Sequence, residues 1–196
     1  YKSIFMCNTL FINIKSNAVG SDAEISEITI IDKNSKIVFE FFINPYVTCD
    51  SSNWIFNSLN AADNFILSLE VGNILRNSVI IGYDMSSQVK LLVKFLSKGQ
   101  TYLNKIKFID LMDVFSKMIN ESDSLGGYCL KDLSSACKYY DLNYELDNKS
   151  KSDAIATLAV YQALVEDEVA LSCCEVFLYH SPNTTSETVS EKEDNS

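Results

Sequence analysis

The amino-acid sequence predicts an α/β fold in a single domain. Segments rich in β-branched residues fill the N-terminal part of the chain, and helical and strand-like segments alternate after it. The chain has 196 residues, of which 47% are hydrophobic, so it is long enough to bury one substantial core. Only six glycines and two prolines interrupt it, which is typical of a globular protein.

Three strands are expected before the first helix. An apolar run at residues 4–6 predicts the first strand, and residues 24–32 and 37–43 predict two more. The sequence Asp32-Lys33-Asn34-Ser35 lies between the second and third strands and has the polar residues of a tight turn. These two strands are therefore expected to form a hairpin.

Helices and two short strands follow the hairpin. The periodicity of apolar residues predicts, in order, a helix at 61–75, a strand at 79–82, a helix at 86–98, a strand at 106–109, and helices at 111–119, 130–140 and 152–173. Near the C-terminus the composition turns to Ser, Thr, Glu, Asn and Asp, which offer too little apolar surface to offset the entropy lost on ordering. We expect a folded domain over residues 1–178 and a disordered acidic tail over residues 179–196.

The charge and the cysteine content exclude several classes of function. A formal net charge of -10 disfavours strong sequence-independent binding to nucleic acid, because that affinity depends on Lys and Arg neutralising phosphates. The six cysteines form no CxxC pair and there is one histidine, so common zinc motifs cannot be assembled. No apolar run is long enough to span a membrane, and cytoplasmic location is the default expectation. The sequence begins at Tyr1 without Met, which suggests a trimmed chain or part of a longer protein.

Four stretches carry a resemblance to a known family. They are the strand sequence of residues 24–32, the sequence Phe39-Glu40-Phe41-Phe42-Ile43-Asn44-Pro45, residues 79–92, and the segment from Tyr128 to Tyr161 that contains Ser152-Asp153-Ala154. In this order they resemble the DEDD exonuclease superfamily, in its proofreading-type branch with a histidine general base. The resemblance covers about residues 3–170. It implies an RNase H-like mixed five-stranded sheet of order 3-2-1-4-5, with strand 2 antiparallel, flanked by helices.

The family's chemistry requires carboxylates that this sequence has mostly replaced. Two divalent cations roughly 3.5–4 Å apart activate a water and stabilise the leaving oxygen, and four carboxylates normally hold them. Two of these lie on the first strand at i and i+2, which places both side chains on one face. The matching residues are Asn8 and Leu10. Because no Asp or Glu precedes Asp22, no shift of the alignment restores this pair.

The second and third motifs are also altered. Gln88 stands where the second motif has an aspartate, and nearby Asp84 is either a displaced metal ligand or, as we favour, a helix N-cap. Asn148 stands where the family has its histidine base and cannot accept a proton near neutral pH. Asp153 alone keeps the family's residue type. We interpret it as a structural carboxylate in the first turn of the last helix, where the helix dipole favours negative charge.

Three lysines and a tryptophan are further candidates for nucleic-acid binding. Lys90, Lys94 and Lys98 recur every four residues on one helix, so they either contact phosphates or, more simply, form a solvated face. Trp54 either stacks on unpaired bases or anchors a loop to the core. His180, the only histidine, is expected to be solvent-exposed.

Two functions remain open from the sequence. We expect a degenerate 3′-to-5′ exonuclease-like domain that is catalytically inactive, needs no cofactor and serves as a protein-interaction or regulatory module. Its protein partner is unknown, its nucleic-acid binding is weak at most, and it has no membrane role. The alternative is an active, divergent exonuclease on DNA or RNA that uses Mg²⁺ or Mn²⁺, with its site rebuilt from Asp84, Asp153 and either Asp110 or Asp22.

Overall fold

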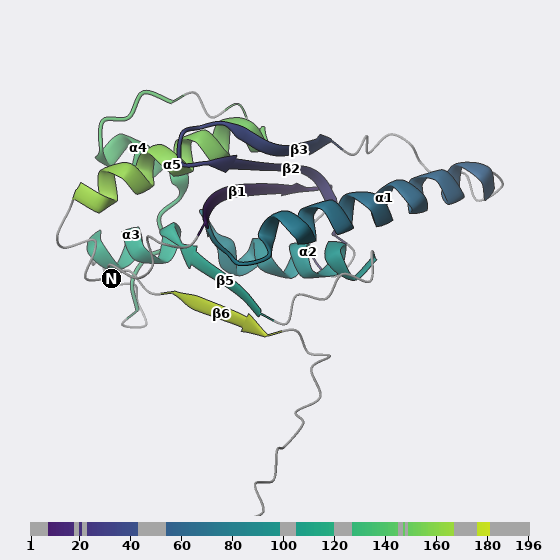
Figure 1. The fold of residues 1–196 in the computed structure, drawn as a ribbon. Helices are drawn as coiled ribbons and strands as arrows, with labels where there is room; N and C mark the ends of the chain where they lie inside the picture. The colour runs from purple at the N-terminus through teal and green to yellow at the C-terminus, as the bar shows by residue number, and fades with distance from the viewer. Residues whose placement is uncertain are drawn as a thin grey trace, which may run out of the picture.

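The protein forms a mixed six-stranded sheet between two layers of helices, as seen in a computed structural model (Figure 1). The structure describes residues 8–17, 20, 23–42, 54–98, 105–119, 127–144, 147, 149–166 and 176–180. Of residues 54–64 and 180 it describes the backbone alone. The strands are β1 (Asn8–Ser16), β2 (Ile25–Asp32), β3 (Ile37–Phe42), β4 (Ser78–Gly82), β5 (Lys105–Asp110) and β6 (Phe177–His180).

The strand order is β3-β2-β1-β4-β5-β6. β1 pairs antiparallel with β2 and parallel with β4, β2 pairs antiparallel with β3, and β4 pairs parallel with β5. The predicted order of the first five strands and the antiparallel second strand are therefore confirmed, together with the RNase H-like fold that they define.

The sixth strand was not predicted from the sequence. β6 pairs antiparallel with β5, and its Phe177 ring stacks on Phe108 at a centroid distance of 5.5 Å. Tyr179 and His180 were expected to begin the acidic tail, but both belong to this edge strand. The rest of the expected tail, residues 181–196, lies outside the described residues.

Five helices cover the sheet. They are α1 (Trp54–Leu75), α2 (Met85–Lys98), α3 (Leu111–Ile119), α4 (Leu133–Tyr139) and α5 (Ser150–Glu166). α1 begins earlier than the apolar periodicity indicated, and residues 167–173 of the predicted last helix lie outside the described residues. The strand predicted at residues 4–6 also lies outside them, and the first described strand is Asn8–Ser16.

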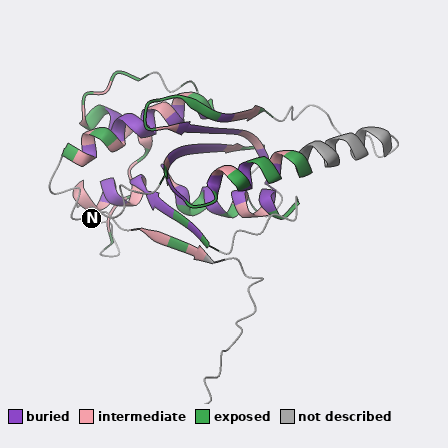
Figure 2. Ribbon diagram, in the orientation of Figure 1, coloured by how far each residue is buried: buried purple, intermediate pink, exposed green. Residues whose placement is uncertain are grey.

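β1 separates two apolar cores because successive side chains point to opposite faces of a strand. Leu10, Ile12 and Ile14 face the core that α1 and α2 cover. Phe11 faces the core formed with α3, α4 and α5, where its ring meets Tyr161 edge-on at 5.2 Å. Figure 2 shows the result, with buried residues concentrated in the central strands and the inner sides of the helices. The position of a residue along β1 therefore decides which helix layer it meets.

The predicted hairpin turn is present and its cause is local. The Asp32 carboxylate Oδ1 accepts hydrogen bonds from the backbone N–H groups of Asn34, at 2.8 Å, and Lys36, at 2.9 Å. Ser35 adopts a positive φ of 62°. An Asp side chain that caps its own turn in this way fixes the connection between β2 and β3.

Gly82, at the end of β4, is required by close packing. A Cβ at this position would lie 2.4 Å from Met85 Sδ and 3.1 Å from the Ile12 carbonyl oxygen. Met85 is fully buried, so its side chain has little room to retreat. We expect Gly82→Ala to reduce the free energy of unfolding by about 1–3 kcal/mol through overpacking, as measured by urea denaturation.

The control for this prediction is the same substitution in a Met85→Ala background. Removing the crowded side chain should make Gly82→Ala much less costly there, because the clash is with Met85. An equal cost in both backgrounds would show that the strain has another origin.

Candidate functional site

Two polar side chains on β1, Asn13 and Lys15, lie on the face opposite Ile12 and Ile14. They line a cavity of about 300 Å³ beyond the C-terminal end of β4. Its other charged or amide-bearing lining residues are Asp84, Gln88 and Asp153. Ends of parallel strands are a common place for ligand sites in open α/β sheets.

Lys15 forms an ion pair with Asp153 across the gap between β1 and α5. The ammonium Nζ donates a hydrogen bond to Asp153 Oδ2. The Asp153 side chain is 12% exposed and that of Lys15 is 29% exposed, so the pair is partly screened from water. A tethered positive charge is thus bound to the Asp153 carboxylate.

Gln88 connects the backbones around the cavity. Its Oε1 accepts a hydrogen bond from the N–H of Ile14 at 2.9 Å, and its Nε2 donates one to the carbonyl of Tyr83 at 2.6 Å. Both ends of this buried amide therefore hold main-chain groups, one on β1 and one just after β4.

Asn13 contributes an unpaired acceptor. The residue is only 5% exposed, and its Oδ1 has no hydrogen-bond partner within the described part of the molecule. Buried polar atoms normally have partners, so this oxygen is an unsatisfied acceptor of a residue in the wall of the cavity.

Asp110 supports the loop that carries Asp84. Its carboxylate accepts hydrogen bonds from the N–H groups of Asp84 (3.0 Å), Ser86 (2.9 Å) and Met112 (3.1 Å), and from Ser86 Oγ (3.0 Å). Asp110 is 1% exposed, so this buried charge is satisfied by four donors. Its lone pairs are committed to the loop between β4 and α2.

Asp84 lies directly before α2 with a positive φ of 64°. Burial raises the pKa of its carboxyl, hydrogen bonds from Ser87 oppose that rise, and the charge of Asp110 adds to it. The bonds from Ser87, in the first turn of α2, agree with the helix-capping interpretation.

The start of α5 is fixed by side chains from β2 and from the linker before the helix. The N–H of Ser150 donates to Glu27 Oε2 at 2.9 Å, and its hydroxyl lies 2.7 Å from Thr29 Oγ1. A hydrogen bond from the Ser152 side chain, aided by the backbone and charge of Lys149, lowers the pKa of Asp147 to about 2. These contacts fix the first turn of α5 and therefore the position of Asp153.

The structure does not bring Asn8 and Leu10 together with Gln88 and Asp153. Leu10 is 2% exposed and belongs to the core under α1 and α2, on the face of β1 away from α5. Asn8 lies at the opposite end of β1 from Lys15. The pair on β1 with i, i+2 spacing that reaches Asp153 is Asn13 and Lys15, five residues further along.

A usable sequence signal for Asn13 and Lys15 did exist. Polar residues alternate with Ile12 and Ile14, which is the pattern of a strand with one buried face and one polar face. The strand predicted at residues 4–6 lies outside the described residues, and the i, i+2 pair was assigned to Asn8 and Leu10, before this alternation begins.

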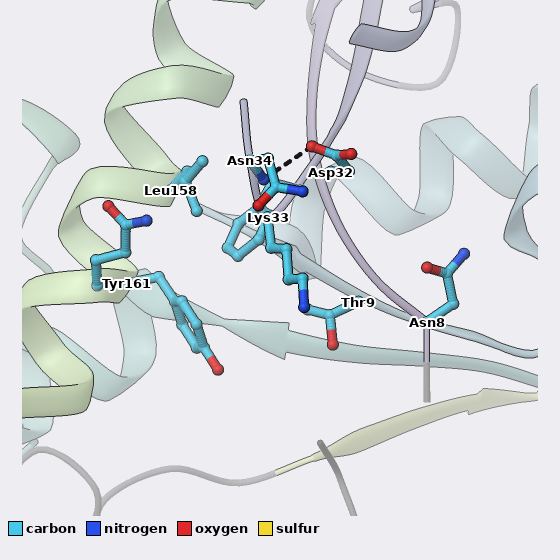
Figure 3. Close-up of a pocket in the computed structure, with 9 residues that line it drawn as sticks. Asn8, Thr9, Asp32, Lys33, Asn34, Leu158 and Tyr161 are labelled. Atoms are coloured by element: carbon cyan, nitrogen blue, oxygen red, sulfur yellow. Dashed lines mark hydrogen bonds between the residues drawn. The ribbon is translucent and has the colours of Figure 1, made fainter. Parts of the chain in front are cut away.

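Asn8 instead lines a second cavity, of about 320 Å³ (Figure 3). Asn8 and Thr9 of β1, the turn residues Asp32 to Asn34, and Leu158 and Tyr161 of α5 surround it. The side-chain amide Nδ2 of Asn8 donates a long hydrogen bond of 3.5 Å to Ser78 Oγ. This cavity contains none of the other residues expected at the site.

The three lysines of α2 have different environments. Lys94 donates to the Ala23 carbonyl at 2.9 Å and pairs with Glu24 at 3.1 Å, while Lys98 also pairs with Glu24. Lys90 is exposed. Two of the three thus hold the start of β2. The Trp54 side chain, Asn148 and Asp22 lie outside the described residues.

Among the described residues there is neither a metal-site cluster nor a membrane-spanning helix. Within those ranges, no group of three or more His, Cys, Asp or Glu side chains has the arrangement of a metal site. None of the described helices is long and apolar enough to cross a membrane.

Comparison with solved structures identifies proteins of similar fold. S. pombe Pop2p, in a form with Mg²⁺ and Mn²⁺ bound, superposes with a TM-score of 0.58 at 9% identity, over 88% of this chain and 90% of that one. The Aedes aegypti Nibbler EXO domain gives a TM-score of 0.41 at 12% identity, over 87% and 82%. No protein-family model and no curated protein matches the sequence. The likeness to Pop2p shows that this chain has the same fold.

Removing the Asp110 carboxylate should destabilise the segments that hydrogen-bond to it beside the cavity. We expect Asp110→Ala to lower the free energy of unfolding by about 3 kcal/mol, because it leaves buried N–H groups without acceptors. Urea denaturation measures this loss, and Asp110→Asn, which keeps one acceptor oxygen, should cost less. Equal stability of the alanine variant and the parent protein would contradict the role assigned to Asp110.

The Asp147 interaction predicts a pH dependence. Its folded pKa of about 2 lies below the ordinary value of 3.8, so its contribution to stability is complete above that ordinary value and is lost as the pH falls through 2. The stability difference between the parent protein and Asp147→Asn should therefore shrink between those two pH values in denaturation experiments. Asp141→Asn, which removes another exposed carboxylate from the same linker, controls for a general charge effect.

Proposed function

We propose that this chain is a degenerate 3′-to-5′ exonuclease-like domain that has lost catalysis and serves as a protein-interaction or regulatory module. The observation that carries the proposal is the composition of the cavity around Asp153. The polar side chains that line it beside Asp153 include the Lys15 ammonium and the carboxamides of Asn13 and Gln88. A nuclease site of this type needs carboxylates there.

The residues present do not fit a pair of divalent cations. Mg²⁺ and Mn²⁺ prefer hard, negatively charged oxygen ligands, and Pop2p was solved with both ions bound. In this cavity the Asp153 carboxylate pairs with Lys15, and the Gln88 amide binds two backbone groups. Asp84, which also lines the cavity, accepts hydrogen bonds from Ser87, and the unpaired Asn13 oxygen is neutral.

The family's motif order supports the same proposal with a corrected register. Asn13 and Lys15 take the i, i+2 positions on the first strand, Gln88 takes the second motif, and Asn148 takes the place of the histidine base. Asp153 alone retains a carboxylate. We regard Asn8 and Leu10 as unrelated to this vestigial site.

Among the described residues, the carboxylates that an active, divergent exonuclease would need are already engaged, and Asp22 lies outside those residues. Asp84 stands beside α2 and is bonded by Ser87, and the Asp110 carboxylate is saturated by four donors. Strong nucleic-acid binding is also disfavoured, because the net charge is -10 and Lys94 and Lys98 bind Glu24. A protein partner is therefore the proposed target, in a cytoplasmic setting.

A nuclease assay with a metal titration tests the proposal. The chain should release no mononucleotides from labelled single-stranded DNA or RNA in Mg²⁺ or Mn²⁺, and calorimetry should detect no Mn²⁺ binding. Loss of several metal ligands removes most of the rate enhancement, so Asp153→Asn should leave the background rate unchanged. An active exonuclease, run in parallel, verifies the assay. Mn²⁺-dependent digestion that Asp153→Asn abolishes would overturn the proposal.

A further inference from the structure

We propose that Lys15 is a tethered counter-cation that stabilises Asp153 and prevents a divalent cation from binding the cavity. The inference rests on the proposed function in one respect, since it takes the present cavity to be free of metal ions. It adds a specific cause: at position 15 an ammonium stands where a metal site would need a carboxylate, so this position both repels a divalent cation and offers it no ligand.

The geometry places both charges on rigid elements. Lys15 lies near the end of β1, where it pairs with Glu27 of β2, while the pairing of β1 with β4 covers Asn8 to Phe11 at the other end of the strand. Asp153 lies in the first turn of α5, which Ser150 attaches to Glu27 and Thr29 of β2. The ammonium therefore meets the carboxylate without reorganising either element.

The cavity has an electrostatic reason to need this cation. Asp153 is only 8% exposed as a residue, and a carboxylate so deeply buried is costly unless it is paired. Either an ammonium or a metal ion can supply the compensating charge. Lys15 supplies it from within the chain and at every solution composition.

Removing the ammonium and adding a carboxylate should reverse this preference. In Lys15→Glu, the new carboxylate at position 15 would face Asp153, with the unpaired Asn13 Oδ1 two residues away on the same face of β1. Two carboxylates and one amide oxygen are hard ligands of the type that Mn²⁺ binds. Without a cation the like charges should repel each other and destabilise the fold.

The first experiment measures the ion pair itself by a double-mutant cycle. Lys15→Met and Asp153→Asn should each lower Tm by roughly 5 °C, because each leaves a partly buried partner uncompensated. The double variant should lose clearly less than the sum of the two, since it removes both members of the ion pair. Additive losses would overturn the role of Lys15 as counter-cation.

The second experiment measures cation binding. Mn²⁺ should raise the Tm of Lys15→Glu by several degrees and give a bound Mn²⁺ signal in electron paramagnetic resonance, while the parent protein and Lys15→Met show neither effect. Lys90→Glu makes the same charge change at an exposed site on α2 and should gain no Mn²⁺ binding. Should Lys15→Glu fold poorly, refolding it with and without Mn²⁺ provides the same comparison.

The outcomes separate this inference from the proposed function. Mn²⁺ binding and nuclease activity in the parent protein would overturn the proposed function. A parent protein that is inert, together with a Lys15→Glu variant that gains no Mn²⁺ binding, would overturn the inference about Lys15 and leave the proposed function standing.

Discussion

The ion pair between Lys15 and Asp153 is the interaction on which charge compensation in this cavity depends. It joins the end of β1 to the first turn of α5, the two elements that bring the remaining carboxylate into the cavity. A buried carboxylate in such a position requires a positive partner. The chain provides that partner itself, so the cavity is electrostatically satisfied without a ligand.

The fold was largely accessible from the sequence, and the site was only partly so. Strand order followed from the resemblance, and the turn at Asp32 followed from its side-chain chemistry. The edge strand β6 was not predicted, because four residues form too short a pattern next to a polar tail. Gln88 and Asp153 were correctly grouped with one another because their helices contain clear motif sequences.

The choice of Asn8 and Leu10 on the first strand has a physical origin. Spacing of i, i+2 defines a face but not a register, and a shift by an odd number of residues moves every side chain to the opposite face. Asn8 and Leu10 satisfied the spacing, yet Leu10 is a core residue below α1 and α2. The register of β1 is fixed by its pairing with β2 and β4, and the alternation of Asn13 and Lys15 with Ile12 and Ile14 was a local pattern that indicated its polar face.

The four hydrogen bonds accepted by Asp110 have a further consequence for how such a scaffold changes over time. They hold Asp84 and the start of α2, and one of them reaches Met112 of α3; of these groups all but Asp84 lie outside the lining of the cavity. The architecture of the rim is therefore independent of its contents. A framework supported in this way can exchange the residues inside it, and lose an old chemistry, while its walls keep their shape for a new use.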